Sequence, residues 1–575
     1  MVTAVPVTGM TAACSGTRTG ADLFAETLET YGVSHLFGNP GTTELPMVHA
    51  LEDVDVEYVL GLHEDVAVGA AAGYAATRRY HAHEDPEITP VGVANLHVAP
   101  GVAHGLGNLY GAAVAGAPIV VTAGNFSTDF RHEEPILSGD LLAMVEQFTK
   151  WSDEVLDVSA LPTMLRRAFR VALTPPTGPV FLAVPMDVQR AETDADPERL
   201  GPIPTPGPGD PDQLERAAEL LVEADSPVLV LGDEVARAGV GAVDAAIDLA
   251  EAAGCRVHAE IMACEINFPP AHECWVSYLP PDEDLASMLL STDTIAFVGC
   301  STNTTLHRHE GRLVDPDTTC IHVGPEPWEL GKNQPADAAV IADPGAAMAE
   351  LAGRVRETLE DEVRESRLES VRATASALEA TIRDLGEDEA DDPRASKAEL
   401  VDAMAAVAPD ALIVDEGVTA KYALLTRWDF EPTRLLSNKG GGLGYGLPAA
   451  VGAALAESQS ADPRTVVGFV GDGSYLYYPH AIHTAVRQEL DLTVVIPDNR
   501  NYRILKDNTL SIMGGTESDY AFQGMDFDPP VDLPRNAESH GAAGFRVEDP
   551  AALESTIESA IETPGPAVVD VLVHD

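Results

Sequence analysis

Two segments, VVGFVGDGSYLYY at residues 466–478 and LTVVIPDNRNY at residues 492–502, indicate the fold of the C-terminal part of the chain. Each begins with a β-branched apolar run and ends in polar residues, which is typical of a strand buried on both faces of a parallel sheet. A helical pattern connects them, as the crossover between parallel strands requires. Because ligands bind beyond the carboxyl ends of such strands, we expect a ligand site at these two polar ends.

The same alternation of apolar runs and helical patterns continues over most of the chain. It predicts an α/β protein with three doubly wound parallel-sheet domains. A length of 575 residues agrees with several hydrophobic cores. The predicted boundaries are a loose N-terminal tail at 1–14, a first domain at 15–192, a Pro/Gly-rich linker at 193–212, a central domain at 213–358, an acidic connecting arm at 359–396 and a third domain at 397–575.

The chain is strongly acidic, with 92 Asp and Glu against 35 Lys and Arg and a formal net charge of −57. Such a surface repels nucleic acid and anionic lipid, so we expect neither as a partner. The acid is spread along the whole length, which favours an adaptation to a salt-rich cytoplasm. The N-terminus lacks the pattern of a secretory signal, and Asn, Tyr, Gly and Pro interrupt the longest uncharged stretch, 105–124. We therefore expect a cytoplasmic protein.

Asp472 stands between two glycines, and Asn499 follows the next apolar run 27 residues later. Gly471 and Gly473 let the backbone approach a ligand closely, and the amides of a helix expected to begin near Pro479 favour a phosphate. One carboxylate with amide and carbonyl oxygens suits Mg²⁺ and does not suit zinc. A lone GDG is most often a plain turn, but two polar strand ends at this separation favour a site for a diphosphate and a metal ion.

The run G-D-G-S, followed by an asparagine-containing strand end, resembles the signature of thiamine-diphosphate-dependent enzymes. The resemblance implies thiamine diphosphate and Mg²⁺ as cofactors, with the side chains of Asp472 and Asn499 and the main-chain carbonyl of Asn501 as metal ligands. Asp498 departs from the pattern, because the family usually has two adjacent asparagines here. The resemblance also implies that the following residues bind the cofactor: Gly471, Gly473, Ser474, Asn501 and Tyr502.

The N-terminal part of the chain provides an independent check. Residues 32–51, GVSHLFGNPGTTELPMVHAL, and 58–79, YVLGLHEDVAVGAAAGYAATRR, resemble the pyrimidine-binding domain of the same family, which makes the third domain the diphosphate-binding one. The resemblance implies that Glu64 contacts the aminopyrimidine ring. Removal of the C2 proton of thiamine requires such a carboxylate, with a proton affinity raised by burial. The alternative for Glu64 is a helix-capping acid, a role that Asp65 could fill instead.

The glycine-rich stretch NKGGGLGYGLPAA, residues 438–450, fails as a dinucleotide fingerprint, because the last glycine of G-x-G-x-x-G is missing. The family resemblance gives it another role. The main-chain carbonyl of Gly441 would accept a hydrogen bond from the amino group of the cofactor, and Leu443 would support the cofactor in a bent conformation. The alternative is tight glycine packing of a helix on a strand.

Further details resemble the benzoylformate decarboxylases within this superfamily. Thr42 in GNPGTTELP and His97 in NLH match a hydroxyl residue and a histidine of their active sites. A second histidine of that family follows a strand of the central domain, where both His307 and His309 are candidates. The segment YRILKDN, residues 502–508, lacks the large aromatic residues found there in the family, so the keto acid is left open. The flavin pattern of acetolactate synthases is not evident, and we expect no FAD.

These features predict the non-oxidative decarboxylation of a small-molecule 2-keto acid to an aldehyde and CO₂. The expected catalytic residues are Glu64, His97, Thr42 and His307. The alternative is the joining of two 2-keto acids, as in acetolactate synthases, and a non-catalytic scaffold or a nicotinamide oxidoreductase fits the residues less well. The family architecture places Glu64 and Asp472 on facing subunits, so we expect a homodimer or homotetramer with its sites at the subunit interface.

Overall fold

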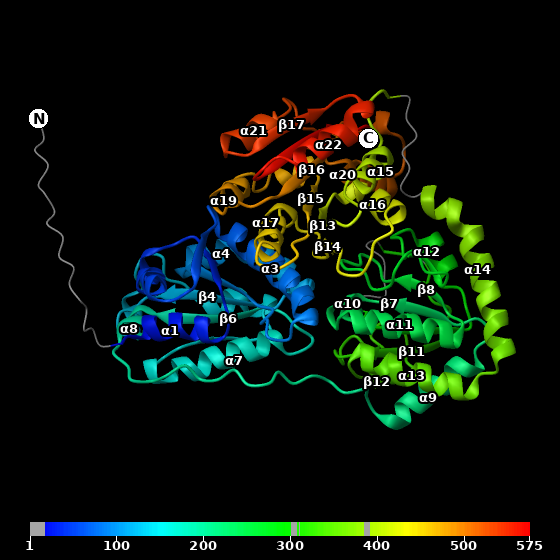
Figure 1. Ribbon diagram of the computed structural model, residues 1–575, viewed down its shortest axis with the longest axis horizontal. Coiled ribbons are helices and arrows are strands. Elements are labelled where there is room, and N and C mark those ends of the chain that lie inside the picture. The colour runs from blue at the N-terminus through cyan, green and yellow to red at the C-terminus, as the bar shows by residue number, and fades with distance from the viewer. Residues whose placement is uncertain (1–17, 301–307, 310, 385–391) are drawn as a thin grey trace, which may run out of the picture.

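The computed structural model of the chain describes residues 18–300, 308–309, 311–384 and 392–575. It has three lobes, coloured blue to cyan, green, and yellow to red along the chain in Figure 1. Each lobe contains one six-stranded sheet, and every strand pair is parallel. The prediction of an α/β protein with three doubly wound parallel-sheet domains is confirmed. The domain boundaries drawn from the sequence stay predictions.

The first sheet has the strand order β2-β1-β3-β4-β6-β5. The chain crosses from one side of β1 to the other between β2 and β3, so the ends of β1 and β3 border the crevice where ligands bind in such sheets. The strands are β1 (His35–Gly38), β2 (Glu57–Leu60), β3 (Gly92–His97), β4 (Ile119–Asn125), β5 (Ser152–Glu154) and β6 (Val180–Pro185). The α-helices are α1 (Gly20–Thr30), α2 (Leu45–Ala50), α3 (Glu64–Glu84), α4 (Val98–His104), α5 (Leu106–Val114), α6 (Leu141–Val145), α7 (Leu161–Leu173) and α8 (Met186–Arg190).

The central sheet has the order β12-β11-β10-β7-β8-β9. Its strands are β7 (Val228–Leu231), β8 (Arg256–Ala259), β9 (Trp275–Tyr278), β10 (Thr294–Val298), β11 (Thr319–Gly324) and β12 (Ala338–Ile341). Its helices are α9 (Pro211–Glu223), α10 (Asp233–Arg237), α11 (Val240–Ala253), α12 (Glu283–Leu289) and α13 (Pro344–Thr358), and the long α14 (Asp361–Asp384) runs along the outer edge of this lobe (Figure 1).

The third sheet has the order β14-β13-β15-β16-β18-β17, and its crevice lies between the ends of β13 and β15. Its strands are β13 (Leu412–Glu416), β14 (Leu435–Ser437), β15 (Val466–Val470), β16 (Thr493–Asp498), β17 (Ala543–Val547) and β18 (Ala567–Leu572). Its helices are α15 (Lys397–Val407), α16 (Lys421–Arg427), α17 (Gly446–Glu457), α18 (Asp472–Tyr475), α19 (Ala481–Arg487), α20 (Arg503–Met513), α21 (Leu533–Ser539) and α22 (Leu553–Ile561).

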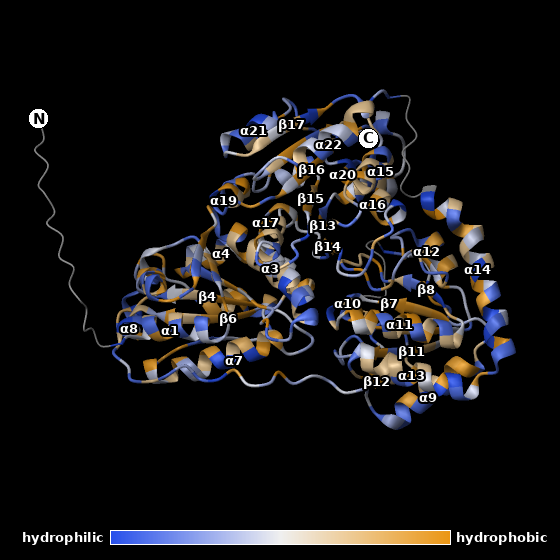
Figure 2. Ribbon diagram, in the orientation of Figure 1, coloured by the Kyte–Doolittle hydropathy of each residue, from blue (hydrophilic) through white to orange (hydrophobic). Residues whose placement is uncertain are grey.

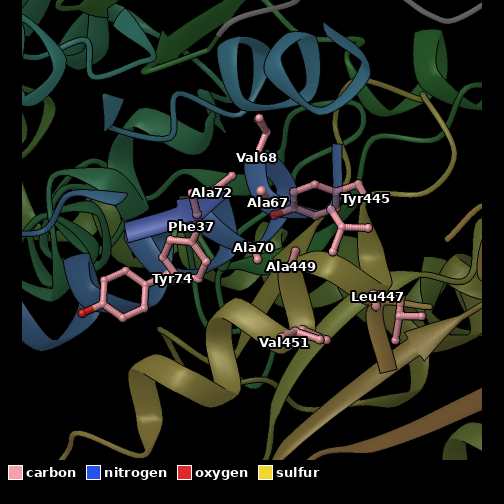
Figure 3. Close-up of a cluster of buried hydrophobic side chains, with 14 of the residues drawn as sticks. Phe37, Ala67, Val68, Ala70, Ala72, Tyr74, Tyr445, Leu447, Ala449 and Val451 are labelled. Carbon is pink, nitrogen blue, oxygen red and sulfur yellow. The ribbon is translucent and has the colours of Figure 1, made fainter. Parts of the chain in front are cut away.

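Helices α3 and α17 join the first and third lobes, and Figure 3 shows their small side chains packed against one another. Their backbones touch at two glycines. A Cβ atom at Gly73 would lie 2.1 Å from the carbonyl oxygen of Ala449, and one at Gly452 would lie 1.9 Å from that of Ala70. Every residue of α17 is buried. The two helices therefore act as a shared core for both lobes.

Apolar residues lie along the sheets, and polar residues lie on the outside of the lobes. Figure 2 shows hydrophobic colour along the inner strands and hydrophilic colour on much of α14. All residues of β3 except its last, His97, are buried, and β4, β6, β15 and β16 are buried throughout. In the part of the chain that the structure describes, no helix has the length and apolarity needed to cross a membrane.

The structure differs from the sequence-based expectation at several elements. It adds the short strands β5, β9, β14 and β17, each of which lies at the edge of its sheet. Such strands have only three to five residues, too few for a clear periodic pattern. The helix expected to begin near Pro479 is present as α19, which begins at Ala481, and a single turn, α18, precedes it from Asp472.

Candidate active site

Asp472 lies at the end of β15, beside the end of β16 that leads to Asn499. Both side chains are buried, with 5% and 9% exposure. Asp472 Oδ1 accepts the N–H of Gly473 at 2.9 Å, whereas Oδ2 is buried without a hydrogen-bond partner among the described residues. Asn501 Oδ1 is also buried and unpartnered there. An orphaned carboxylate oxygen beside amide oxygens fits a hard cation such as Mg²⁺, which would supply the missing partner.

Three carboxylates lie close together at this site, those of Asp472, Asp498 and Asp570. Burial, together with the nearby Asp498, raises the pKa of Asp472 to about 8. Burial and the same Asp498 raise the pKa of Asp570 on β18 to about 7, although Arg546 Nε donates to Asp570 at 2.9 Å. Sequence reasoning missed Asp570, because only the pairing of β16 with β18 brings it beside Asp498. Three close, buried acids are an environment that a bound divalent cation would stabilise.

A small cavity of about 50 Å³ opens at these strand ends. The predicted cofactor-binding residues Gly471, Gly473, Ser474, Asn501 and Tyr502 line it, as does Leu443. A Cβ atom at Gly473 would lie 2.6 Å from the Tyr502 ring, so the ring packs directly on the glycine. Gly441 does not line the cavity; it is exposed with φ +69°, a conformation that favours glycine.

Glu416, at the end of β13, holds the loop that carries Leu443. It is 3% exposed, and its two oxygens accept four hydrogen bonds. The donors are the backbone N–H groups of Gly444, Tyr445 and Gly446 at 3.2, 3.2 and 2.8 Å, and Asn438 Nδ2 at 2.8 Å. Burial still raises the pKa of Glu416 to about 7. Sequence reasoning missed this residue, whose only signal was an acid at a strand end.

In the first lobe, Glu64 is the first residue of α3 and is 8% exposed. Its Oε2 lies 3.2 Å from His104 Nδ1. The helix is capped by His63, whose Nδ1 accepts the N–H of Asp65 at 3.1 Å. The capping role offered to Asp65 is therefore wrong: its carboxylate instead accepts from Asn108 N at 2.7 Å and from the hydroxyl of Tyr478 at 2.8 Å.

His97 ends β3 and faces the loop that follows β1. Its Nδ1 lies 2.8 Å from Glu44 Oε2 and 3.1 Å from Thr43 Oγ1. Glu44 is fully buried, and burial raises its pKa. The predicted residue Thr42 is exposed, and it is the neighbouring Thr43 that reaches His97. Glu44 is a further residue that the sequence did not single out.

Glu64 and His97 lie on either side of one glycine. A Cβ atom at Gly101 would lie 3.2 Å from Glu64 Oε1 and 3.2 Å from the Cβ of His97. The first lobe thus brings two of the predicted catalytic residues together. His307 lies outside the described residues, and His309 has its Nδ1 2.7 Å from the carbonyl oxygen of Gly311 in the central lobe.

Three segments of the chain match thiamine pyrophosphate enzyme domains. Residues 18–155 match the N-terminal TPP binding domain, 214–351 the central domain and 417–571 the C-terminal TPP binding domain. The chain therefore belongs to the thiamine pyrophosphate enzyme family.

Similar proteins include both decarboxylases and synthases. A benzoylformate decarboxylase of Pseudomonas aeruginosa is 30% identical over 95% of this chain and 97% of its own length. The acetolactate synthase isozyme 3 large subunit of Escherichia coli is 26% identical over 94% and 92%. Among solved structures, a thiamine diphosphate-dependent 4-hydroxybenzoylformate decarboxylase of Rhodococcus jostii has a TM-score of 0.81 at 27% identity, with 97% of this chain and 99% of that chain covered. These likenesses agree with membership of the family.

Proposed function

We propose that this chain is a thiamine-diphosphate- and Mg²⁺-dependent decarboxylase that converts a 2-keto acid to an aldehyde and CO₂. The observation that carries the proposal is the buried, unpartnered Oδ2 of Asp472 beside Asn499 and Asn501. Buried polar atoms without partners are rare in folded proteins, and a site for a missing ion explains this one. The similarity to benzoylformate decarboxylase favours decarboxylation over other reactions of the family.

When bound, thiamine diphosphate supplies the nucleophilic carbon and the electron sink that decarboxylation requires. In this proposal Asp472, Asn499 and the carbonyl of Asn501 hold Mg²⁺, and the residues that line the small cavity hold the diphosphate. Gly441 and Leu443 support the rest of the molecule, and Glu64 holds and returns the proton of the aminopyrimidine ring.

His97 is proposed to move protons on the substrate. Because Nδ1 is engaged by Glu44 and Thr43, Nε2 is the nitrogen that can give or take a proton. The buried side chain of Glu44 fixes the orientation of the His97 ring, as an orienting acid does for a catalytic histidine. Thr42, exposed in the same loop, would bind the substrate carboxylate, and His307 or His309 would supply a second imidazole.

We further propose that two chains build each site, as a homodimer or homotetramer in the cytoplasm. A cavity of about 50 Å³ is far below the roughly 300–1,000 Å³ of pockets that hold whole organic ligands. Large apolar side chains are exposed beside both half-sites: Leu62 at 45% precedes Glu64, and Ile504 at 38% and Leu505 at 44% follow Tyr502. A facing subunit would cover such side chains and complete the pocket.

The test is CO₂ release from benzoylformate, pyruvate and branched-chain keto acids, in high salt with added thiamine diphosphate and Mg²⁺. Glu64→Ala should abolish release while the cofactor still binds, and the exposed Glu52→Ala serves as the matched control. Unchanged turnover by Glu64→Ala would refute the assignment. The alternative is acetolactate-synthase-like carboligation, which the 26% identical synthase supports. Analysis of the products formed from pyruvate distinguishes an aldehyde, the product of decarboxylation, from the joined product of carboligation.

A further inference from the structure

His104 lies between a buried carboxylate and the surface of the single chain. It is the last residue of α4, and its Nδ1 lies 3.2 Å from Glu64 Oε2. The Glu64 side chain is 10% exposed and that of His104 is 58% exposed. One imidazole therefore contacts Glu64 through Nδ1 while more than half of its side chain is exposed at the surface of the chain.

The surroundings of His104 leave Glu64 as its acidic partner. The His63 ring stacks on the His104 ring at 5.2 Å, but His63 Nδ1 is already occupied by the N–H of Asp65. The rings of Tyr478 and His480 also lie near the His63 ring, at centroid distances of 5.2 and 6.2 Å. Asp65 itself is engaged by Asn108 and Tyr478. The titratable groups around these rings are Glu64, His63, Asp65, Tyr478 and His480, and among the described residues only Glu64 bonds to His104.

We propose that His104 is a proton relay between Glu64 and solvent, an inference that rests on the proposed function. The Glu64 carboxyl passes its proton from Oε2 to Nδ1 of His104, and the imidazolium formed releases the proton on Nε2 to water. The reverse sequence reloads Glu64. In sum one proton moves between Glu64 and water, and the ring returns to its neutral form. Such a path matters because cofactor and substrate would cover Glu64 and exclude water from it.

The first test measures exchange of the C2 proton of bound thiamine diphosphate for deuterium, without substrate, together with the dissociation constant of the cofactor. His104→Asn and His104→Ala should slow exchange about 10²-fold or more while the dissociation constant stays within about threefold. Added imidazole should restore exchange in His104→Ala, whose missing ring leaves a gap open to solvent. The matched control is His49→Asn, since His49 also pairs with a glutamate, Glu52, at 3.2 Å but on the exposed surface.

Unchanged exchange in both His104 variants, or slow exchange that imidazole does not restore, would overturn the relay. Because no substrate is used, a failure to release CO₂ from any keto acid leaves this test intact. Absence of any cofactor binding would instead sink the proposed function itself.

A second readout needs no cofactor. Three ligand atoms, one each from His63, Glu64 and His104, lie within 4.8 Å of one another. Two imidazoles and a carboxylate are a ligand set that suits Zn²⁺. Both variants are prepared as the full chain, without cofactor and with the additional substitution Asp472→Ala. Equilibrium dialysis should then show one bound zinc ion fewer for His104→Asn than for His49→Asn. Equal zinc binding by the two would mean that His104 does not face Glu64, and would overturn the proposal.

Discussion

Replacing Gly452 by alanine should weaken the contact between α3 and α17. The added Cβ would sit 1.9 Å from the backbone oxygen of Ala70, an atom that cannot rotate away. A normal contact needs at least about 3 Å, so the helices must separate by about 1 Å. Overpacking of this kind costs about 3 kcal/mol. Alanine gains about 1 kcal/mol of helix propensity over glycine, which leaves a net loss of about 2 kcal/mol.

Gly353→Ala is the matched control. Gly353 is an exposed residue within α13, and an added Cβ there meets nothing within 4 Å. The same substitution should therefore raise the free energy of unfolding by up to about 1 kcal/mol, so that the two variants differ by about 3 kcal/mol. Urea titration in high salt, followed by circular dichroism, measures both values. A Gly452→Ala protein as stable as Gly353→Ala would refute the close helix contact.

The Gly452→Ala variant also tests whether the contact between α3 and α17 positions the residues of the active site. Helix α3 begins at Glu64, and α17 begins three residues after Leu443. A shift of about 1 Å between the helices should displace both half-sites, so thiamine diphosphate should bind at least about tenfold more weakly to Gly452→Ala and normally to Gly353→Ala.

Three further predictions follow from buried and surface charge. Burial lowers the pKa of His258 to about 3 and that of His322 to about 4. The free energy of unfolding should therefore fall as the pH drops below about 6.5, by up to about 1.4 kcal/mol per pH unit for each histidine. The urea midpoints at pH 7.5 and pH 5 should differ less in His258→Leu than in the unsubstituted protein. Glu44→Gln should lower the rate of CO₂ release about 10²-fold with cofactor affinity retained, and an unchanged rate would exclude its role through His97. With a net charge of −57, the protein should melt at lower temperature in 10 mM than in 1 M NaCl; equal melting temperatures would contradict a salt adaptation.

The features that could be predicted from the sequence are those that depend on local patterns of apolar and polar residues. Long β-branched runs identified the inner strands, and polar residues directly after two of them placed Asp472 and Asn499 side by side, as the pairing of β15 with β16 confirms. The polar edge strand β5, with the sequence SDE, carries no such run and was missed.

The remaining site residues depend on contacts between segments far apart in the chain. Asp570 reaches the metal-binding side only through sheet register. Thr43 rather than Thr42 meets His97 because the loop enters a 3-10 turn at Thr42, which exposes one threonine and buries the next. His104 lies seven residues beyond His97 and becomes significant only because α4 brings it back to Glu64. Periodicity carries no signal for such contacts.

The close approach of α3 and α17 also restricts how this chain can change over generations. Gly73 faces Ala449, and Gly452 faces Ala70, so each glycine is matched to a small residue on the opposite helix. A larger side chain at any of the four positions would require a compensating change across the contact or a new helix crossing. Among homologues that keep this helix pair, we therefore expect these two pairs of positions to covary.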